Sequence, residues 1–137
     1  MAQKLSGGCA CGAIRYECNV DPAIMLNCHC RDCQRASGSA YAAIVAVPKA
    51  AVQIRGEPRY HGIVGEAGKL VERGFCPTCG SQVTMKLGRL PDLLGLQAAS
   101  LDDPSVYRPA MDAFVSSAQP WDHMDSSIQK HMQGPPL

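Results

Sequence analysis

Short apolar stretches separated by turn residues run along most of the chain. Six of them alternate apolar with polar residues or form brief apolar runs, the pattern of strands of about four to eight residues. Glycine and proline are frequent in the connections between them, which favours turns. The pattern therefore predicts a mainly β protein with short strands. The six stretches are residues 13–20, 41–48, 51–56, 69–75, 82–87 and 93–99.

Helical periodicity is weak and confined to two places. Residues 30–37 (CRDCQRAS) and 125–132 (DSSIQKHM) each fit one short helical turn. The end of the chain has few apolar anchors, so we expect it to fray or to pack on a partner. We therefore divide the chain into one domain, residues 1–124, and a C-terminal tail, residues 125–137.

Composition limits the class of protein. The 137 residues suit one compact domain, and the near-neutral net charge of +1, spread along the chain, gives no basic face for nucleic acid. The longest apolar run, Tyr41 to Val47, is too short to cross a bilayer. We expect a cytoplasmic protein without nucleic-acid or membrane partners. In that reducing compartment, the eight cysteines are expected to be thiols or metal ligands.

The spacing of the cysteines predicts metal sites. The sequence CPTCG, with Cys76 and Cys79, is a zinc knuckle, in which Gly80 supplies the backbone freedom of the turn. Cys9 and Cys11 lie two apart and share one face of an extended strand. Together these four cysteines would complete a tetrahedral structural zinc site, which has no open position.

That grouping leaves Cys28, Cys30 and Cys33 as a second site. Three protein ligands with one open position are the arrangement of a catalytic zinc. A second partition is also compatible with the spacing: Cys9 and Cys11 could join Cys28 and Cys30, which would leave Cys33, Cys76 and Cys79 as the open site. Cys18 stands alone and is interpreted as a small buried apolar residue.

Several other residues are candidates for roles near these sites. His29 lies between two cysteines and, on an extended backbone, points away from them; His29, His61 or His123 could still supply a fourth ligand. Arg31 and Arg35 could grip a substrate carboxylate or be surface cations.

Two further charged motifs have a structural and a functional interpretation. Asp102 and Asp103 could be paired carboxylates, but Asp before proline favours a turn or helix start. Arg73 is predicted to pair with one of these acids or to neutralise the four-cysteine site.

Three thiolates make zinc a weak Lewis acid, so the open site favours binding an incoming thiol over generating hydroxide. A bound thiol loses its proton and becomes a nucleophile. The sequence is thus compatible with an enzyme acting on a small-molecule thiol. The rival interpretation is a zinc-stabilised protein-binding module without catalysis.

Five motifs in this order resemble the glutathione-dependent formaldehyde-activating enzyme family, which includes centromere protein V. The similarity extends from about Gly7 to Trp121. The chain departs from the family pattern at Asp112, where members often have histidine, and at Ala99, where glycine is common. The motifs are GGCACGAIRYE, NCHCRDCQRASGS, RGFCPTCGS, SLDDP and SSAQPW.

The resemblance implies a β-tent fold with two zinc ions per chain, held according to the first partition. It implies carbon-sulfur lyase activity, the condensation of glutathione with formaldehyde. If the family histidine contacts substrate, Asp112 changes that contact here.

Overall fold

The structure, a computed structural model, describes residues 4–135. Strands form most of the regular structure, which confirms the mainly β prediction. The strands are β1 (Leu5–Gly8), β2 (Arg15–Cys18), β3 (Ile24–Cys28), β4 (Ala42–Pro48), β5 (Val52–Arg55), β6 (Arg59–Val64), β7 (Leu70–Phe75), β8 (Gln82–Leu87), β9 (Leu93–Gln97), β10 (Met111–Ala113) and β11 (Gln129–Lys130). The helices are α1 (Arg31–Ser37) and the 3-10 turns η1 (Lys49–Ala51), η2 (Ala98–Ser100), η3 (Pro104–Val106) and η4 (Val115–Ser117).

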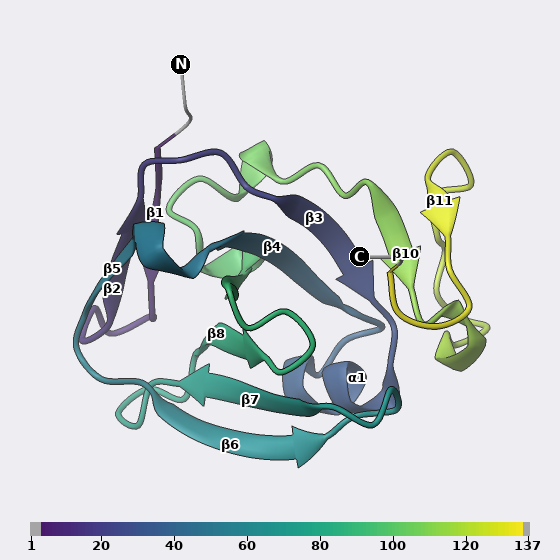
Figure 1. The fold of residues 1–137 in the computed structure, drawn as a ribbon, viewed down its shortest axis with the longest axis horizontal. Helices are drawn as coiled ribbons and strands as arrows, with labels where there is room; N and C mark the ends of the chain where they lie inside the picture. Colours follow the sequence, from purple (N-terminus) through teal and green to yellow (C-terminus); the bar gives the residue numbers. More distant parts are fainter. Residues whose placement is uncertain (1–3, 136–137) are drawn as a thin grey trace.

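Within residues 4–135 the strands form a small and a large sheet. The small sheet has the order β1-β2-β5, and the large sheet has the order β11-β10-β3-β4-β9-β8-β7-β6. Figure 1 shows the large sheet curving from β3, β4 and β10 at the top of the view to β6 and β7 at the bottom, with α1 between these two arms. Side chains from β3, β4, β7 and β8 consequently line one common interior space.

Strand β4 is buried on both faces because it lies inside the large sheet. Val45 and Val47 pack in one apolar cluster with Tyr16, whereas Ile44 packs in a second cluster with Met85. Successive side chains of a strand point to opposite faces, so both sets must be apolar. This double burial explains the uninterrupted apolar run in the sequence at this position.

Each of the six stretches predicted as strands contains an observed strand. The sequence pattern did not indicate β1, β3, β6, β10 or β11. Strand β1 has the sequence LSGG, and β3 ends in Asn27 and Cys28. Hydrogen bonding to neighbouring strands, rather than local propensity, defines these elements.

The helical turn predicted at residues 30–37 is confirmed, but the one predicted at 125–132 is wrong. That second segment contains β11, which pairs in parallel with β10. Strand β10 pairs with β3 along one edge. The backbone N–H and C=O groups along its other edge need hydrogen-bond partners, and the segment that contains β11 provides them.

The expectation of a fraying tail is also wrong for residues 125–135. The backbone N–H of Phe114 donates to the carbonyl of Gln133 at 2.9 Å, and that of Val115 donates to His131 at 3.0 Å. Residues 136–137 of the predicted tail lie outside the described residues.

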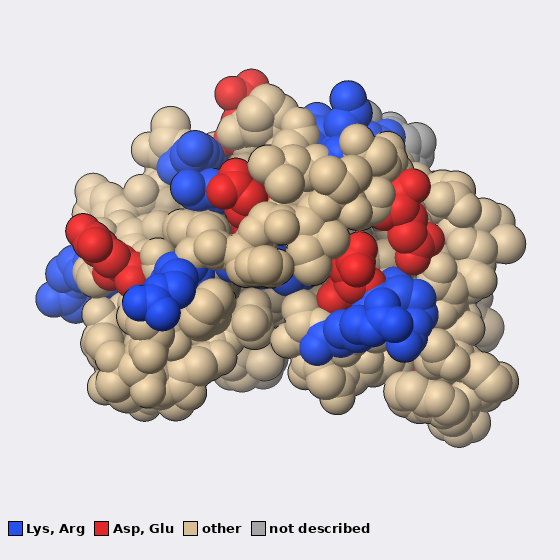
Figure 2. All heavy atoms as spheres, turned by 90° about the horizontal axis from the view of Figure 1, so that it is seen from below, with Lys and Arg blue, Asp and Glu red and all other residues tan. Residues whose placement is uncertain are grey.

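Figure 2 shows acidic and basic side chains interspersed on one face of the molecule, without a broad patch of one sign. Among residues 4–135, no helix is long and apolar enough to cross a membrane.

Candidate metal centres

Four cysteines from distant parts of the chain meet at one point: Cys9, Cys11, Cys76 and Cys79. Their sulfur atoms all lie within 4.8 Å of one another. The Sγ atoms of Cys9 and Cys11 are 3.6 Å apart, and those of Cys11 and Cys76 are 3.7 Å apart. The loop after β1 is thereby joined to the connection between β7 and β8.

A tight turn aims Cys76 and Cys79 at this point. The N–H of Gly80 donates to the carbonyl of Cys76 at 2.8 Å, and Gly80 has a φ of 79°, a conformation that favours glycine. Ser81, which the sequence did not single out, supports both halves of the group. Its Oγ accepts from the N–H of Ala10 at 3.0 Å, and hydrogen bonds from Ser81 lower the pKa of Cys79 to about 5.

Cys28, Cys30 and Cys33 form the second group, and their sulfur atoms also lie within 4.8 Å of one another. Cys28 ends β3, Cys30 caps the N-terminus of α1, and Cys33 lies in its first turn. The N–H of Cys33 donates to the Cys30 sulfur at 3.3 Å, so the cap itself orients one sulfur. All three side chains are buried. The structure thus brings the cysteines together in the first of the two partitions considered above.

Arg73 lies beside the three-cysteine group. It is only 7% exposed, and its Nη2 donates to the sulfur of Cys33 at 3.3 Å. Hydrogen bonds from Cys28 and Cys33 lower the pKa of Cys30, and the positive charge of Arg73 acts in the same direction. The prediction that Arg73 pairs with Asp102 or Asp103, or serves the four-cysteine site, is wrong, because β7 directs its side chain into the interior of the curved sheet.

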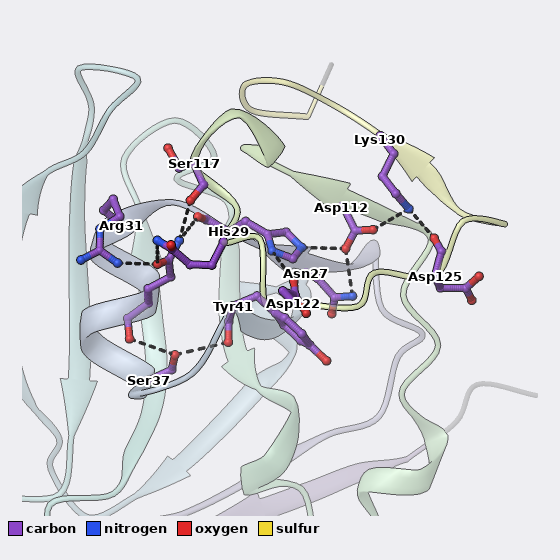
Figure 3. Close-up of polar contacts among 12 residues, drawn as sticks. Asn27, His29, Arg31, Ser37, Tyr41, Asp112, Ser117, Asp122, Asp125 and Lys130 are labelled. Carbon is purple, nitrogen blue, oxygen red and sulfur yellow. Dashed lines mark hydrogen bonds and ion pairs between the residues drawn. The ribbon is translucent and has the colours of Figure 1, made fainter.

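His29 points away from the sulfur atoms, as expected for a residue between two ligands. Its ring is fully buried, and its Nε2 lies 2.8 Å from Oδ1 of Asp112. Its Nδ1 lies 3.2 Å from Oδ2 of Asp122, an ion-pair distance without hydrogen-bond geometry. Figure 3 shows the imidazole held between these two carboxylates.

Asp112 connects His29 to the end of the chain. Its Oδ2 lies 2.8 Å from Nζ of Lys130 on β11, and its Oδ1 accepts from Asn27 at 3.2 Å (Figure 3). Burial acts to raise the pKa of Asp112, but the hydrogen bonds from Lys130, His29 and Asn27 outweigh it and lower the pKa. Asp112 lies away from the interior space, which Ala113 lines instead.

The remaining candidates are not part of either cysteine group. Asp102 binds Arg15 and Ser6, and Asp103 caps η3, which confirms the turn interpretation over an acid-base pair.

Arg31 and Arg35 are exposed on α1, and neither lines the interior space. Cys18 is fully buried outside both groups, as predicted. Neither His61 nor His123 lies close enough to the cysteine groups to be a further ligand of either.

The donor sets fit metal ions of the thiolate-binding class. Sulfur ligands select zinc or other soft ions, and four sulfurs complete a tetrahedral site. Three buried sulfurs leave one position of such a site open. The interior space beside them is a cavity of about 130 Å³, lined in part by Cys28, Cys30 and Cys33. A small molecule in the cavity would therefore contact the open position.

Comparison with known proteins agrees with the fold and the motifs. A crystal structure of a Rhodobacter sphaeroides protein, solved by a structural genomics programme, is similar with a TM-score of 0.55 and 22% identity, covering 71% of this chain and 87% of that chain. None of the curated proteins matches. The family model for the glutathione-dependent formaldehyde-activating enzyme matches residues 4–117. The chain therefore belongs to the glutathione-dependent formaldehyde-activating enzyme family.

Proposed function

We propose that the chain is a zinc-dependent carbon-sulfur lyase that forms or cleaves adducts between a thiol and a small carbonyl compound in the cytoplasm. The observation behind this proposal is the buried group of three cysteines beside a cavity. A closed site of four cysteines can only stabilise the fold, whereas a three-ligand site can accept a substrate atom. The family model supports the same class of reaction, with glutathione and formaldehyde as its named substrates.

The residues have distinct roles in this proposal. Cys28, Cys30 and Cys33 would hold a catalytic zinc, and the other four clustered cysteines would hold a structural one. Zinc bound by three thiolates would coordinate the sulfur of an incoming thiol and favour its deprotonated form. Arg73, 3.3 Å from the Cys33 sulfur, offsets the excess negative charge of the thiolates.

The reaction needs no oxidant or reductant. The thiol sulfur donates an electron pair to the carbonyl carbon, a carbon-sulfur bond forms, and the carbonyl π bond breaks. The proton lost by the thiol ends on the former carbonyl oxygen. Cleavage is the reverse, in which the hydroxyl proton returns to the sulfur as the carbonyl re-forms.

The test is the zinc content per chain, measured by elemental mass spectrometry on the wild type and on Cys33→Ala. We expect about two zinc ions in the wild type and about one in a folded Cys33→Ala protein that has lost lyase activity. About one zinc in both proteins, with no thiol-dependent change, would contradict the proposal.

The second candidate function is a zinc-stabilised protein-binding module, and one observation favours it. Strand β6 is one of the two outer strands of the large sheet, and Ile63 and Val64 at its end are 39% and 65% exposed. An exposed apolar edge strand is a common site of strand pairing with another chain. This candidate predicts normal partner binding by the Cys33→Ala protein, whereas the lyase proposal predicts loss of its activity.

A further inference from the structure

The cavity beside the three-cysteine group has a composition that limits what it can bind. Its lining comes mainly from strands β3, β4, β7, β8 and β10, from α1, and from the loops that follow β6 and β8. Its inner wall is made of aliphatic and thioether side chains, and several of them belong to the second apolar cluster. These wall residues are Ile24, Leu26, Ile44, Val71, Met85 and Leu87.

Five charged residues line the cavity, and four of them have other contacts or are exposed to solvent. The fifth, Asp32, is half-buried in the first turn of α1. The carboxylate of Glu66 accepts from the backbone N–H of Arg31 at 3.1 Å and from Ser117 at 3.0 Å. One nitrogen of the Arg73 guanidinium, Nη2, donates to the Cys33 sulfur. Glu66, Lys69 and Arg89 are exposed, so their charges lie at the mouth of the cavity rather than in its interior.

This interior is a poor environment for a whole glutathione molecule. Glutathione carries two carboxylates, an ammonium and two peptide groups, and burying such groups without partners is costly. Sites that enclose a ligand of that size have volumes of roughly 300 to 1,000 Å³. The cavity here has a volume of about 130 Å³. Only one small group of a substrate can occupy it.

The size and lining match an aromatic or branched apolar group. An apolar cavity of roughly 150 Å³, lined by similar aliphatic side chains in another protein, stays dry and binds benzene. The volume of about 130 Å³ here is close to that value. A phenyl ring or a short branched alkyl chain would therefore fit this volume and contact the apolar wall directly.

We propose that the substrate of the three-cysteine site is a thiol, or a thiol-carbonyl adduct, whose apolar group, a phenyl ring or short branched alkyl chain, fills this cavity. This inference rests on the proposed function and adds the class of substrate to it. The sulfur would lie toward Cys28, Cys30 and Cys33, and any polar part of the molecule would lie at the mouth, near Lys69 and Glu66.

The first test measures occupancy of the cavity without any thiol or metal chemistry. Toluene is titrated into the full-length zinc protein while the methyl resonance of Met85 is followed by NMR. Met85 is 2% exposed and lines the cavity, so we expect its resonance to shift in a saturable way. An unmoved resonance at saturating toluene overturns the proposal.

Two matched variants on β7 locate the binding. Val71 lines the cavity, whereas its neighbour Leu70 is 47% exposed and does not line it. Val71→Phe should lower toluene affinity by about tenfold or more, because the larger ring fills the space, and Leu70→Phe should leave it unchanged. If Val71→Phe does not fold, Leu90→Phe, at another lining position, replaces it. Equal affinity in both β7 variants overturns the proposal.

The second test separates this inference from the proposed function. Cobalt-substituted protein is titrated with phenylmethanethiol, 2-mercaptoethanol and glutathione while its absorption spectrum is recorded. We expect phenylmethanethiol to bind about tenfold or more tightly than the other two. If glutathione binds as tightly or more tightly, the inference fails and the proposed function stands. If toluene shifts Met85 but no thiol changes the cobalt spectrum, the apolar site stands and the proposed function fails.

Discussion

At the scale of single residues, Arg73 determines the charge balance of the three-cysteine group. Its guanidinium is the cation that contacts one of these sulfurs, at 3.3 Å from Cys33, and it is almost fully buried. Three thiolates around a divalent ion leave one negative charge in excess, so a buried cation nearby stabilises the loaded site. Hydrogen-bond partners of metal ligands commonly affect metal affinity by about 10- to 100-fold.

We therefore expect Arg73→Met, which keeps the length of the side chain but removes its charge, to weaken zinc binding at this group by about tenfold or more. Chelator competition on the folded protein measures this affinity. Arg35→Met is the matched control, because Arg35 is exposed on α1 and lies outside the cavity lining. Equal zinc affinity in both variants would contradict the role assigned to Arg73.

Asp112 is a second residue whose environment leads to a prediction, here about how stability depends on pH. It is 1% exposed, accepts hydrogen bonds from His29 and Asn27, and lies 2.8 Å from the ammonium of Lys130. These three contacts together lower its pKa. Because the pKa is lower in the folded than in the unfolded protein, the ionised carboxylate stabilises the fold above the unfolded value of about 3.9. This stabilisation disappears as the pH falls through the folded pKa.

Asp112→Asn should consequently reduce the free energy of unfolding by about 2 kcal/mol at neutral pH, the typical effect of hydrogen bonds to a charged group. The difference from wild type should shrink as the pH falls below about 4. Urea denaturation at several pH values measures it, and acid effects on the cysteines cancel because both proteins share them. Glu57→Gln, at an exposed site, is the control. A difference that stays constant down to pH 3 would exclude this explanation.

At the scale of elements, the last segment of the chain is part of the folded domain. Strand β11 covers the open edge of β10, and the backbone N–H of His131 donates to the carbonyl of Asp112 at 2.9 Å. Three further backbone hydrogen bonds join Phe114, Val115 and Ser116 to this segment. Strand β10 also pairs with β3, which ends at Cys28 of the three-cysteine group. The last segment therefore stabilises the strand next to the one that carries Cys28.

A protein ending at Met124 should therefore be less stable than one ending at Pro135. Four backbone hydrogen bonds contribute about 1 kcal/mol each, so we expect the free energy of unfolding to fall by about 4 kcal/mol. Chemical denaturation of the two proteins measures the difference, and hydrogen exchange of the amide of Phe114 shows whether it arises at β10. Equal stability would mean that residues 125–135 are dispensable.

At the scale of the whole molecule, the four-cysteine group connects the loop after β1 to the turn between β7 and β8. Cys11 and Cys76 are 65 residues apart in the sequence, yet their sulfur atoms are 3.7 Å apart. A metal ion at this position would close a long loop, and its binding free energy, about 10 to 16 kcal/mol for structural zinc sites, would also be folding free energy.

Cys76→Ala should thus unfold the protein at room temperature, whereas Cys18→Ala should cost only about 1 kcal/mol, the loss from a small cavity. The comparison is matched, because Cys76 and Cys18 are both fully buried and only Cys76 belongs to a group of sulfur atoms. Circular dichroism and zinc content report the result. A folded Cys76→Ala protein with full zinc content would contradict the proposed ligand set.

The sequence by itself determined the strands with clear alternation, the mainly β class and the pairs of cysteines within each motif. These features depend on neighbouring residues: strand periodicity repeats every two residues, and a knuckle spans only Cys76 to Gly80. The turn of helix at residues 30–37 was predictable for the same reason. The segment at 125–132 was not, because its pairing with β10 outweighs its local preference.

Only the tertiary structure decided which cysteine motifs meet, since spacing along the chain allowed two partitions. Curvature of the large sheet then placed Arg73 of β7 beside Cys33 of α1, a contact between residues 40 positions apart. The same curvature created the apolar cavity, whose lining comes from five strands. A partner for His29 also had to come from a distant strand, because a buried imidazole needs hydrogen bonds that its own segment cannot supply. Such long-range contacts depend on how sheets pack and bend, and no local pattern records them.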